Sequence, residues 1–370
     1  MKYILFSILS FLSVISYSQT AEDWKNKGNL KIDKLDYIGA IADYTKALEI
    51  DPKYISAYLN RGLTKKKIQD YLGAIADYNK AIELDNKYLS AYINRGVTKI
   101  DIKDYVGALD DFNQAIEIDP KNIKIYINRG ITKNYLKDYI GALNDYNKAI
   151  ELDSKCIIAF YNRGLTKNNT QNYLGAISDY TKAIELNPKY TLAYINRGNV
   201  KIDIKDYKGA LADYNKAIEI DPKNDDSYFN RGNLKFNILD YKGAMEDYNL
   251  VIELNPKYAF AYYNRGSLKL DLADYRGAIE DFNIAIELNN KYTDAYYNRG
   301  NSKLKLLDYN GAIEDYTKVI EFNSKHSGAY NNRAISKIQL NNIEGGCLDF
   351  SKAGELGDID AYEKIQKYCN

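Results

Sequence analysis

The sequence predicts an all-α fold in which ten similar helix pairs stack along the chain. The tripeptide Asn-Arg-Gly begins at Asn60 and recurs every 34 residues as far as Asn298. Within each interval, apolar and small residues recur every three or four residues, a spacing that indicates helices rather than strands. An Asp or Asn precedes the second predicted helix of every pair, and a Pro follows that helix in five pairs. Together these observations indicate an α-solenoid, in which each pair buries its apolar face against its neighbours.

We number positions 1 to 34 within each repeat, counting from Ala21. The repeats lie at about residues 21–54, 55–88, 89–122, 123–156, 157–190, 191–224, 225–258, 259–292, 293–326 and 327–360. We expect the array to occupy residues 19–360. Because the last repeat of a stack needs a cover for its outer apolar face, we expect a capping helix over residues 361–370.

Each repeat carries signals for two helices. In the first helix, position 4 is aromatic and position 8 is Gly in nine repeats, as in Trp24 and Gly28. The second helix follows the Asp or Asn at position 16, an N-cap that satisfies free backbone donors. It has small or aromatic residues at positions 20, 24 and 27. The five prolines all occupy position 32, where this helix should stop: Pro52, Pro120, Pro188, Pro222 and Pro256.

With these residues in place, the chain resembles the tetratricopeptide repeat (TPR) family. The first repeat shows the family pattern at positions 4, 8, 17, 20, 24, 27 and 32, in Trp24, Gly28, Tyr37, Ala40, Tyr44, Ala47 and Pro52. The resemblance implies a right-handed superhelix of antiparallel helix pairs whose first helices line the concave side. A glycine at position 19 recurs in all ten repeats, although the family pattern does not require it.

The charges are balanced and periodic. Lys plus Arg total 51 and Asp plus Glu total 50, which argues against a polybasic nucleic-acid binder. Position 7 is always basic and position 23 is always Asp, so we expect ion pairs between the two helices. For Arg95 the candidate partners are Asp77 and Asp111, and the sequence does not choose between them. The rival interpretation is a solvent-exposed basic stripe for an anionic polymer.

Asn occupies position 6 of every repeat, although Asn is a mediocre helix former. The row resembles the asparagine ladder with which some long arrays of the family hold an extended peptide. A carboxamide both donates and accepts, so it matches the C=O and N–H groups of a peptide bond. The candidate peptide-binding amides are Asn60, Asn94, Asn128, Asn162, Asn196, Asn230, Asn264 and Asn298. The alternative is that each Asn bonds the adjacent repeat and contacts no ligand.

The residues beside this row differ between the two halves of the chain. Position 9 is aliphatic in the second to fifth repeats, at Leu63, Val97, Ile131 and Leu165, and polar in the next four. The amino-terminal half of the groove should therefore be the more apolar, and we include these four residues in the candidate binding site.

Residues 1–18 have the layout of a secretory signal: a positive start, an apolar run of about a dozen residues, and small residues before Gln19. We therefore expect export to the periplasm, the cell envelope or the exterior, with no membrane span after signal removal. Export permits disulfide formation. Cys347 in the last helix pair and Cys369 in the tail are candidates for such a bond, and two free thiols are the alternative.

No motif indicates catalysis or a cofactor. His326 is the only histidine, no Cys pair has zinc-ligand spacing, and no Gly-rich phosphate loop is present. The sequence thus predicts a non-catalytic exported scaffold that binds a protein or extended peptide in its concave groove, without cofactor, metal or nucleic acid. The alternative is an envelope structural or assembly subunit that works through self-association. The oligomeric state stays open.

Overall fold

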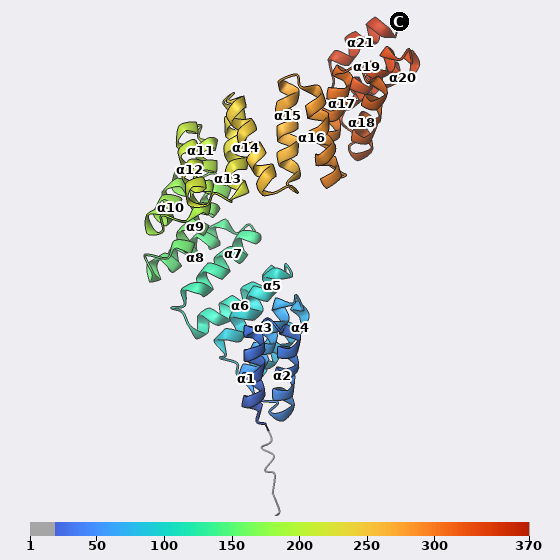
Figure 1. Ribbon diagram of the computed structural model, residues 1–370. Helices are drawn as coiled ribbons and strands as arrows, with labels where there is room; N and C mark the ends of the chain where they lie inside the picture. The colour runs from blue at the N-terminus through green and yellow to red at the C-terminus, as the bar shows by residue number, and fades with distance from the viewer. Residues whose placement is uncertain (1–18, 370) are drawn as a thin grey trace, which may run out of the picture. The chain divides into compact units, whose positions relative to one another are not determined.

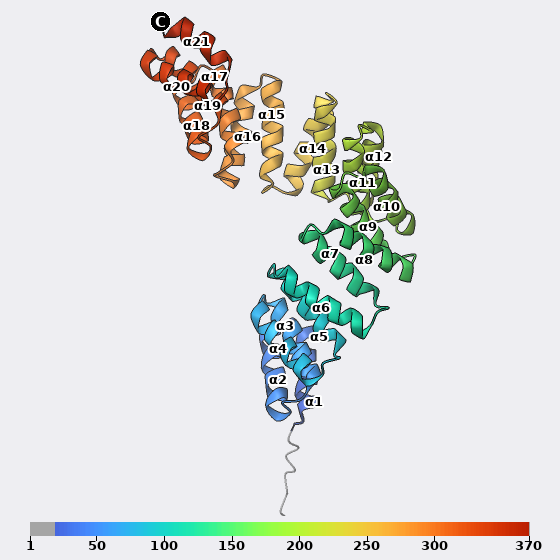
Figure 2. The same ribbon diagram turned by 180° about the vertical axis from the view of Figure 1, so that it is seen from behind.

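The computed structural model describes residues 19–369, so the predicted signal segment lies outside the described residues. These residues form α-helices and no strand (Figures 1 and 2). The first helices of the ten repeats are α1 (Ala21–Asp33), α3 (Ile55–Lys67), α5 (Leu89–Asp101), α7 (Ile123–Tyr135), α9 (Ile157–Asn169), α11 (Thr191–Asp203), α13 (Asp225–Asn237), α15 (Ala259–Asp271), α17 (Thr293–Lys305) and α19 (Ser327–Gln339). The second helices are α2 (Tyr37–Ile50), α4 (Tyr71–Leu84), α6 (Tyr105–Ile118), α8 (Tyr139–Leu152), α10 (Tyr173–Leu186), α12 (Tyr207–Ile220), α14 (Tyr241–Leu254), α16 (Tyr275–Leu288), α18 (Tyr309–Phe322) and α20 (Ile343–Glu355). A last helix, α21 (Asp360–Tyr368), follows them.

The helices group into two compact units, with the division inside the fifth repeat. Unit 1 comprises α1–α9 and unit 2 comprises α10–α21. Within each unit a helix packs against its predecessor and its successor, and the first helices of most neighbouring repeats also touch one another. The first helices therefore form one layer of each unit, and the second helices form the other.

The turn inside each helix pair is built from a left-handed residue and an N-cap. In the first repeat, Leu35 has φ 60°, and the N–H of Asp36 donates to the carbonyl of Lys31 at 2.9 Å. Asp36 then caps α2, because its Oδ1 accepts from the N–H of Gly39 at 2.9 Å. A Cβ on Gly39 would collide with the Asp36 carboxylate. The glycine at position 19 is therefore explained by the cap that faces it.

The core of each repeat forms where the position 24 ring covers the position 8 glycine. Tyr44 is fully buried, and a Cβ on Gly28 would lie 2.6 Å from the Cε1 of Tyr44. Ala40 and Ala47 on the same helix are also fully buried. A glycine in the middle of a helix costs about 1 kcal/mol relative to alanine, and at position 8 it allows the close approach of the two helices.

The C-terminal end is closed by α21. Ile365 and Tyr368 pack on the buried side chains of Ile338 and Phe350. A disulfide joins Cys347 in α20 to Cys369 directly after α21, with a Cα–Cα distance of 5.8 Å. The last apolar face is therefore covered by a helix that is tied covalently to its neighbour.

Candidate functional site

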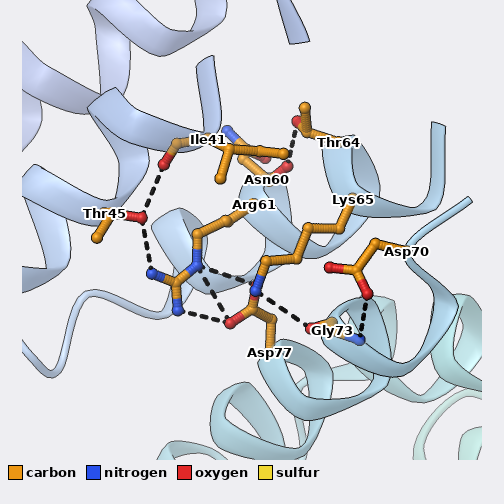
Figure 3. Close-up of polar contacts among 9 residues, drawn as sticks. All are labelled: Ile41, Thr45, Asn60, Arg61, Thr64, Lys65, Asp70, Gly73 and Asp77. Atoms are coloured by element: carbon orange, nitrogen blue, oxygen red, sulfur yellow. Dashed lines mark hydrogen bonds and ion pairs between the residues drawn. The ribbon is translucent and has the colours of Figure 1, made fainter. Parts of the chain in front are cut away.

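The periodic bases belong to an internal network. In the second repeat the guanidinium of Arg61 contacts Asp77, with Nη2 at 2.6 Å from Oδ1 (Figure 3). The ammonium of Lys65 lies 2.9 Å from Oδ2 of Asp77 and donates to the carbonyl of Gly73 at 3.4 Å. The Arg–Asp pair recurs within the same repeat at Arg95–Asp111, Arg129–Asp145, Arg197–Asp213, Arg231–Asp247, Arg265–Asp281, Arg299–Asp315 and Arg333–Asp349. The expected ladder is confirmed, and Arg95 selects Asp111.

Each of these arginines also contacts the preceding repeat. Nη1 of Arg129 donates to Oδ1 of Asn113 at 2.8 Å, and its guanidinium carbon lies 5.7 Å from the ring centre of Tyr126. The side chain of Arg129 is 19% exposed and that of Asp145 is 4% exposed. The basic row is therefore a structural link between helices and repeats, and it is not available as a stripe for an anionic polymer.

The asparagine row divides into two groups. In the first group, the position 6 amide donates across to the preceding repeat. Asn60 donates to Oδ1 of Asn29 at 3.1 Å, and the hydroxyl of Tyr44 donates to the same oxygen at 2.8 Å. The same three-residue arrangement joins Asn264, Asn233 and Tyr248, and Asn332, Asn301 and Tyr316. Asn298 similarly reaches Tyr263 and Ser267 of the preceding repeat.

In the second group the amide does not cross between repeats. Asn94 donates to the carbonyl of Ser90 at 2.7 Å, and Asn162 donates to that of Ile158 at 2.9 Å, one turn earlier in the same helix. Asn196 also donates within its own helix, to the carbonyl of Leu192 at 3.0 Å, but it has a further contact and is not assigned to this group. Among residues 19–369, the side chains of Asn128 and Asn230 have no hydrogen-bond partner.

Position 9 of the preceding repeat largely explains this division. Where it is Asn or Ser, its oxygen accepts the amide, as Asn29 does for Asn60. Where it is aliphatic, as Leu63 is before Asn94, position 9 offers no acceptor, and the amide of Asn94 bonds its own helix instead. Asn230 is the exception, because the preceding Asn199 accepts only from Tyr214. The sequence contained this signal, since position 9 changes from aliphatic to polar along the chain.

We define the unit 1 face as the amides and aliphatic side chains that the first helices α3, α5, α7 and α9 carry at positions 6 and 9. It consists of Asn60, Leu63, Asn94, Val97, Asn128, Ile131, Asn162 and Leu165. All of them are partly exposed, Leu63 by 37%. A groove of about 890 Å³ opens over the first part of this face, lined by Asn60, Leu63 and Asn94 among others.

The corresponding surface of unit 2 is polar and aromatic. A pocket of about 410 Å³ lies between α13 and α15, lined by Asn233, Phe236, Asn237, Tyr248, Tyr263, Asn264 and Ser267. Burial raises the pKa of Tyr248 above its ordinary value, so its hydroxyl keeps its proton and acts as a hydrogen-bond donor to Asn233. This pocket lies in the carboxyl-terminal half of the chain, and it lacks the aliphatic residues that the sequence places in the amino-terminal half.

The remaining chemistry-bearing residues have structural contacts. His326 caps α19, since its Nδ1 accepts from the N–H of Ala329 at 3.0 Å, and its ring lies 4.7 Å from that of Tyr297. Cys156 precedes α9 as a free, half-buried thiol. Within the described part of the chain, no group of three or more His, Cys, Asp or Glu side chains is placed to hold a metal ion.

Family models identify the repeats. A model described as tetratricopeptide repeat matches residues 55–88, 89–122, 123–156, 157–190, 225–258 and 261–292, and a second model with that description matches 293–326. A model described as TPR repeat matches residues 28–69 and 198–238. The chain belongs to the tetratricopeptide repeat family, and the predicted all-α solenoid of antiparallel helix pairs is confirmed.

Solved structures agree on the fold. A tetratricopeptide repeat protein from Parabacteroides merdae has a TM-score of 0.56 at 19% identity, over 73% of this chain and 100% of that one. The chain in the APC/C hetero-tetramer Cut9–Hcn1 has a TM-score of 0.51 at 14% identity, over 95% of this chain and 76% of that one. No curated protein matches the chain. The longest helix in residues 19–369 has 14 residues, and none of the helices is long and apolar enough to cross a membrane.

Proposed function

We propose that this chain is an exported, non-catalytic scaffold that holds an extended peptide or partner segment along the unit 1 face. The observation that carries the proposal is the state of three consecutive amides. Asn94, Asn128 and Asn162 make no bond to a neighbouring repeat, and they lie in a row beside partly exposed aliphatic side chains. A row of amides that is not consumed by the stack is suited to the main chain of a ligand.

The chemistry of the face supports an extended ligand. Successive side chains of an extended segment alternate between two sides, so its main chain can meet the amides while every second side chain meets the aliphatic residues. Proteins of this repeat family bind peptides and proteins. The signal-like residues 1–18 support export, because a charged start, an apolar run and small residues are the features that secretion requires.

The test separates ligand binding from stability. A ligand is first selected from a random peptide library on the mature chain, and its affinity is then measured by calorimetry. We expect the triple variant Asn94→Ala, Asn128→Ala, Asn162→Ala to lose about 10-fold or more in affinity, because the bonds to the ligand main chain are lost. Its melting temperature should not fall, because none of these amides bonds a neighbouring repeat and alanine favours the helix that loses the bonds of Asn94 and Asn162.

The control triple variant is Asn60→Ala, Asn264→Ala, Asn332→Ala, which removes amides that bond the preceding repeat. It should melt at a lower temperature, because it leaves the partly buried Oδ1 of Asn29, Asn233 and Asn301 short of one donor. If the first triple variant binds the selected peptide as well as the parent chain does, the amides do not hold the ligand and the proposal fails.

A second candidate function, self-association, is favoured by a separate surface. Position 18, near the start of each second helix, is aliphatic and 64% to 76% exposed in the first four repeats, at Ile38, Leu72, Val106 and Ile140. In the sixth to eighth repeats the same position is Lys208, Lys242 and Arg276. Light scattering tests this candidate: a monomer at high concentration contradicts it, whereas a dimer that Leu72→Lys with Val106→Lys dissociates supports it.

A further inference from the structure

An exposed aromatic surface lies on α13, α15 and the turns that precede α15 and α17. We define this aromatic face by Phe229, Tyr258, Phe260, Tyr263 and Tyr292. Tyr258 meets Phe229 at 5.0 Å and Phe260 at 6.3 Å between ring centres, and Tyr292 meets Phe260 at 5.5 Å and Tyr263 at 4.8 Å. Phe260 is 55% exposed, although its neighbours hold it on two sides. The ring is therefore rigidly placed and accessible.

Two carboxylates flank this ring. Asp226 and Asp294 occupy the same helix position as Phe260 in the repeats before and after it, and both are exposed. The hydroxyl of Tyr258 donates to Oδ1 of Asp226 at 3.3 Å. Burial first, and Asp226 next, raise the pKa of Tyr258 to about 12, so its hydroxyl stays protonated and serves as the donor to Asp226.

These carboxylates have no cationic partner in the part of the chain that the structure describes. The arginines of the neighbouring repeats are committed to Asp247, Asp281 and Asp315. The turns before α13, α15 and α17 carry Lys223, Lys257 and Lys291, and none of these lysines forms an ion pair with Asp226 or Asp294. The negative charge beside Phe260 is thus uncompensated within the fold.

The pocket of about 410 Å³ between α13 and α15 adjoins the aromatic face. Tyr263 belongs to the aromatic face and also lines the 410 Å³ pocket, together with Asn233, Asn264 and Ser267. Unit 1 offers no equivalent, because position 2 there has one acid and no aromatic ring: it is Glu22, Ser56, Ser90, Lys124 and Ile158 in successive repeats. A ligand that crosses the aromatic face of unit 2 therefore meets acids, an exposed ring and amides in succession.

We propose that the aromatic face of unit 2 docks an extended basic segment of a partner protein, with an arginine or lysine side chain over Phe260 between Asp226 and Asp294. A cation over an aromatic ring is attracted by the ring's quadrupole, and flanking carboxylates add charge complementarity. The inference rests on the proposed function, namely that the first helices of the repeats hold extended chains. It adds a basic segment to the ligand that we propose for the unit 1 face.

The experiment uses three short, terminally blocked peptides that differ only in carrying Arg, Gln or Glu at the same alternate positions. Binding to the mature chain is followed by fluorescence anisotropy at low and high salt. We expect the Arg peptide to bind about 10-fold or more tightly than the Gln peptide at low salt, with the difference shrinking as salt rises. We expect the Glu peptide to bind most weakly.

Variants then locate the site. Phe260→Leu keeps an apolar side chain but removes the ring, and Asp226→Asn with Asp294→Asn removes the charge while keeping an acceptor for Tyr258. Each should cost the Arg peptide about 10-fold in affinity and leave the Gln peptide unaffected. The matched control, Glu280→Gln with Glu314→Gln, removes the same charge from exposed positions of α16 and α18, and it should change neither peptide.

The outcomes distinguish the two proposals. Equal affinity for the three peptides overturns the basic-segment inference and leaves the scaffold proposal standing. If the Asp226→Asn, Asp294→Asn variant and its Glu→Gln control lose equal affinity for the Arg peptide, binding depends on net charge alone. That result also overturns the inference. If no peptide of any composition binds, and none is selected for the unit 1 face, both proposals fall.

Discussion

The hydroxyl of Tyr78 is buried without a hydrogen-bond partner among the described residues. Its equivalents Tyr44, Tyr214, Tyr248 and Tyr316 donate to an Asn at position 9 of their own repeat. In the second repeat this position is Leu63. An unsatisfied buried hydroxyl costs about 1–3 kcal/mol, so this repeat carries a local defect that the repeats with Asn at position 9 avoid.

This defect predicts a stabilising substitution. Leu63→Asn should raise the free energy of unfolding by about 1 kcal/mol, because the new Oδ1 accepts from Tyr78. The measurement is urea unfolding followed by circular dichroism. Val97→Asn is the control, since its repeat has Phe112 in place of the tyrosine and gains no such bond. Equal effects of the two substitutions would show that the hydroxyl is not the cause.

The left-handed residue at position 15 is a second local feature. It has φ between 59° and 66° in every repeat and is never Gly. Ala273, with φ 61°, is the simplest case because it has no long side chain. Ala273→Gly should stabilise the chain by about 1 kcal/mol, since a Cβ is disfavoured in this conformation.

The control substitution should change the free energy of unfolding in the opposite direction. Ala212 is exposed in the middle of α12, so Ala212→Gly should destabilise the chain by about 1 kcal/mol. Urea unfolding of both variants at one temperature tests the pair. Loss of stability in both would mean that the turn tolerates its Cβ without strain.

At the scale of the helix pair, one carboxylate anchors two cations. Asp145 receives Nη2 of Arg129 at 2.6 Å and Nζ of Lys133 at 2.8 Å, and Arg129 extends to the preceding repeat. Asp145 thus joins the two helices of its own repeat and, through the arginine, the preceding helix pair. This explains why the bases and acids recur with the same period.

Removing the anchor should be costly. We expect Asp145→Ala to lower the free energy of unfolding by about 3–5 kcal/mol, because two partly buried cations lose their partner. Glu151→Ala is the control, since Glu151 pairs with Lys148 on the surface and should contribute less than about 0.5 kcal/mol. Denaturant unfolding measures both, and a small effect of Asp145→Ala would mean that solvent replaces the carboxylate at little cost.

The last helix pair shows how the close approach is preserved when residues change. Positions 8 and 20 are Gly and Ala in nine repeats, but Ala334 and Gly346 in the tenth. A Cβ on Gly346 would lie 3.1 Å from the carbonyl oxygen of Ala334, so the two positions face each other. The methyl group has moved from one helix to the other, and the total volume between the helices is conserved.

At the scale of the whole molecule, the buried tyrosines couple stability to alkaline pH. Burial raises the pKa of Tyr44 from 10.0 to about 12, and it likewise raises the pKa values of Tyr146, Tyr214 and Tyr316. Because the folded pKa exceeds the unfolded pKa, this contribution to stability is complete below about pH 10 and is lost as the pH rises toward the folded values.

We therefore expect the urea midpoint to fall steeply between about pH 10 and pH 12. The ultraviolet absorbance of tyrosinate provides the second readout: the exposed tyrosines should titrate first, and the buried ones only together with unfolding. Replacing Tyr146 and Tyr316 by Phe, as Phe112 and Phe282 occur naturally, should weaken the dependence. A midpoint that does not change up to pH 12 contradicts the prediction.

Some structural features of this chain can be predicted from the sequence and others cannot. The repeat bounds, the N-caps and the residue types of the ion-pair ladder follow from the sequence, because helical spacing, capping and the 34-residue period are local properties. The position 15 conformation was not predicted, since no glycine marks it. The disulfide partners were candidates, and their geometry depends on how α21 packs on α20.

For the candidate site, the sequence by itself determined which residues recur: an Asn at position 6 of every repeat and a change at position 9 from aliphatic to polar. Only the tertiary structure decided which amides bond a neighbour and which stay within their own helix, as Asn60 and Asn94 illustrate. It also decided that Arg95 pairs with Asp111 within its own repeat. The physical reason is that period and spacing place a side chain on a helix face, whereas its hydrogen-bond partner depends on which atoms of the adjacent helix lie within about 3 Å.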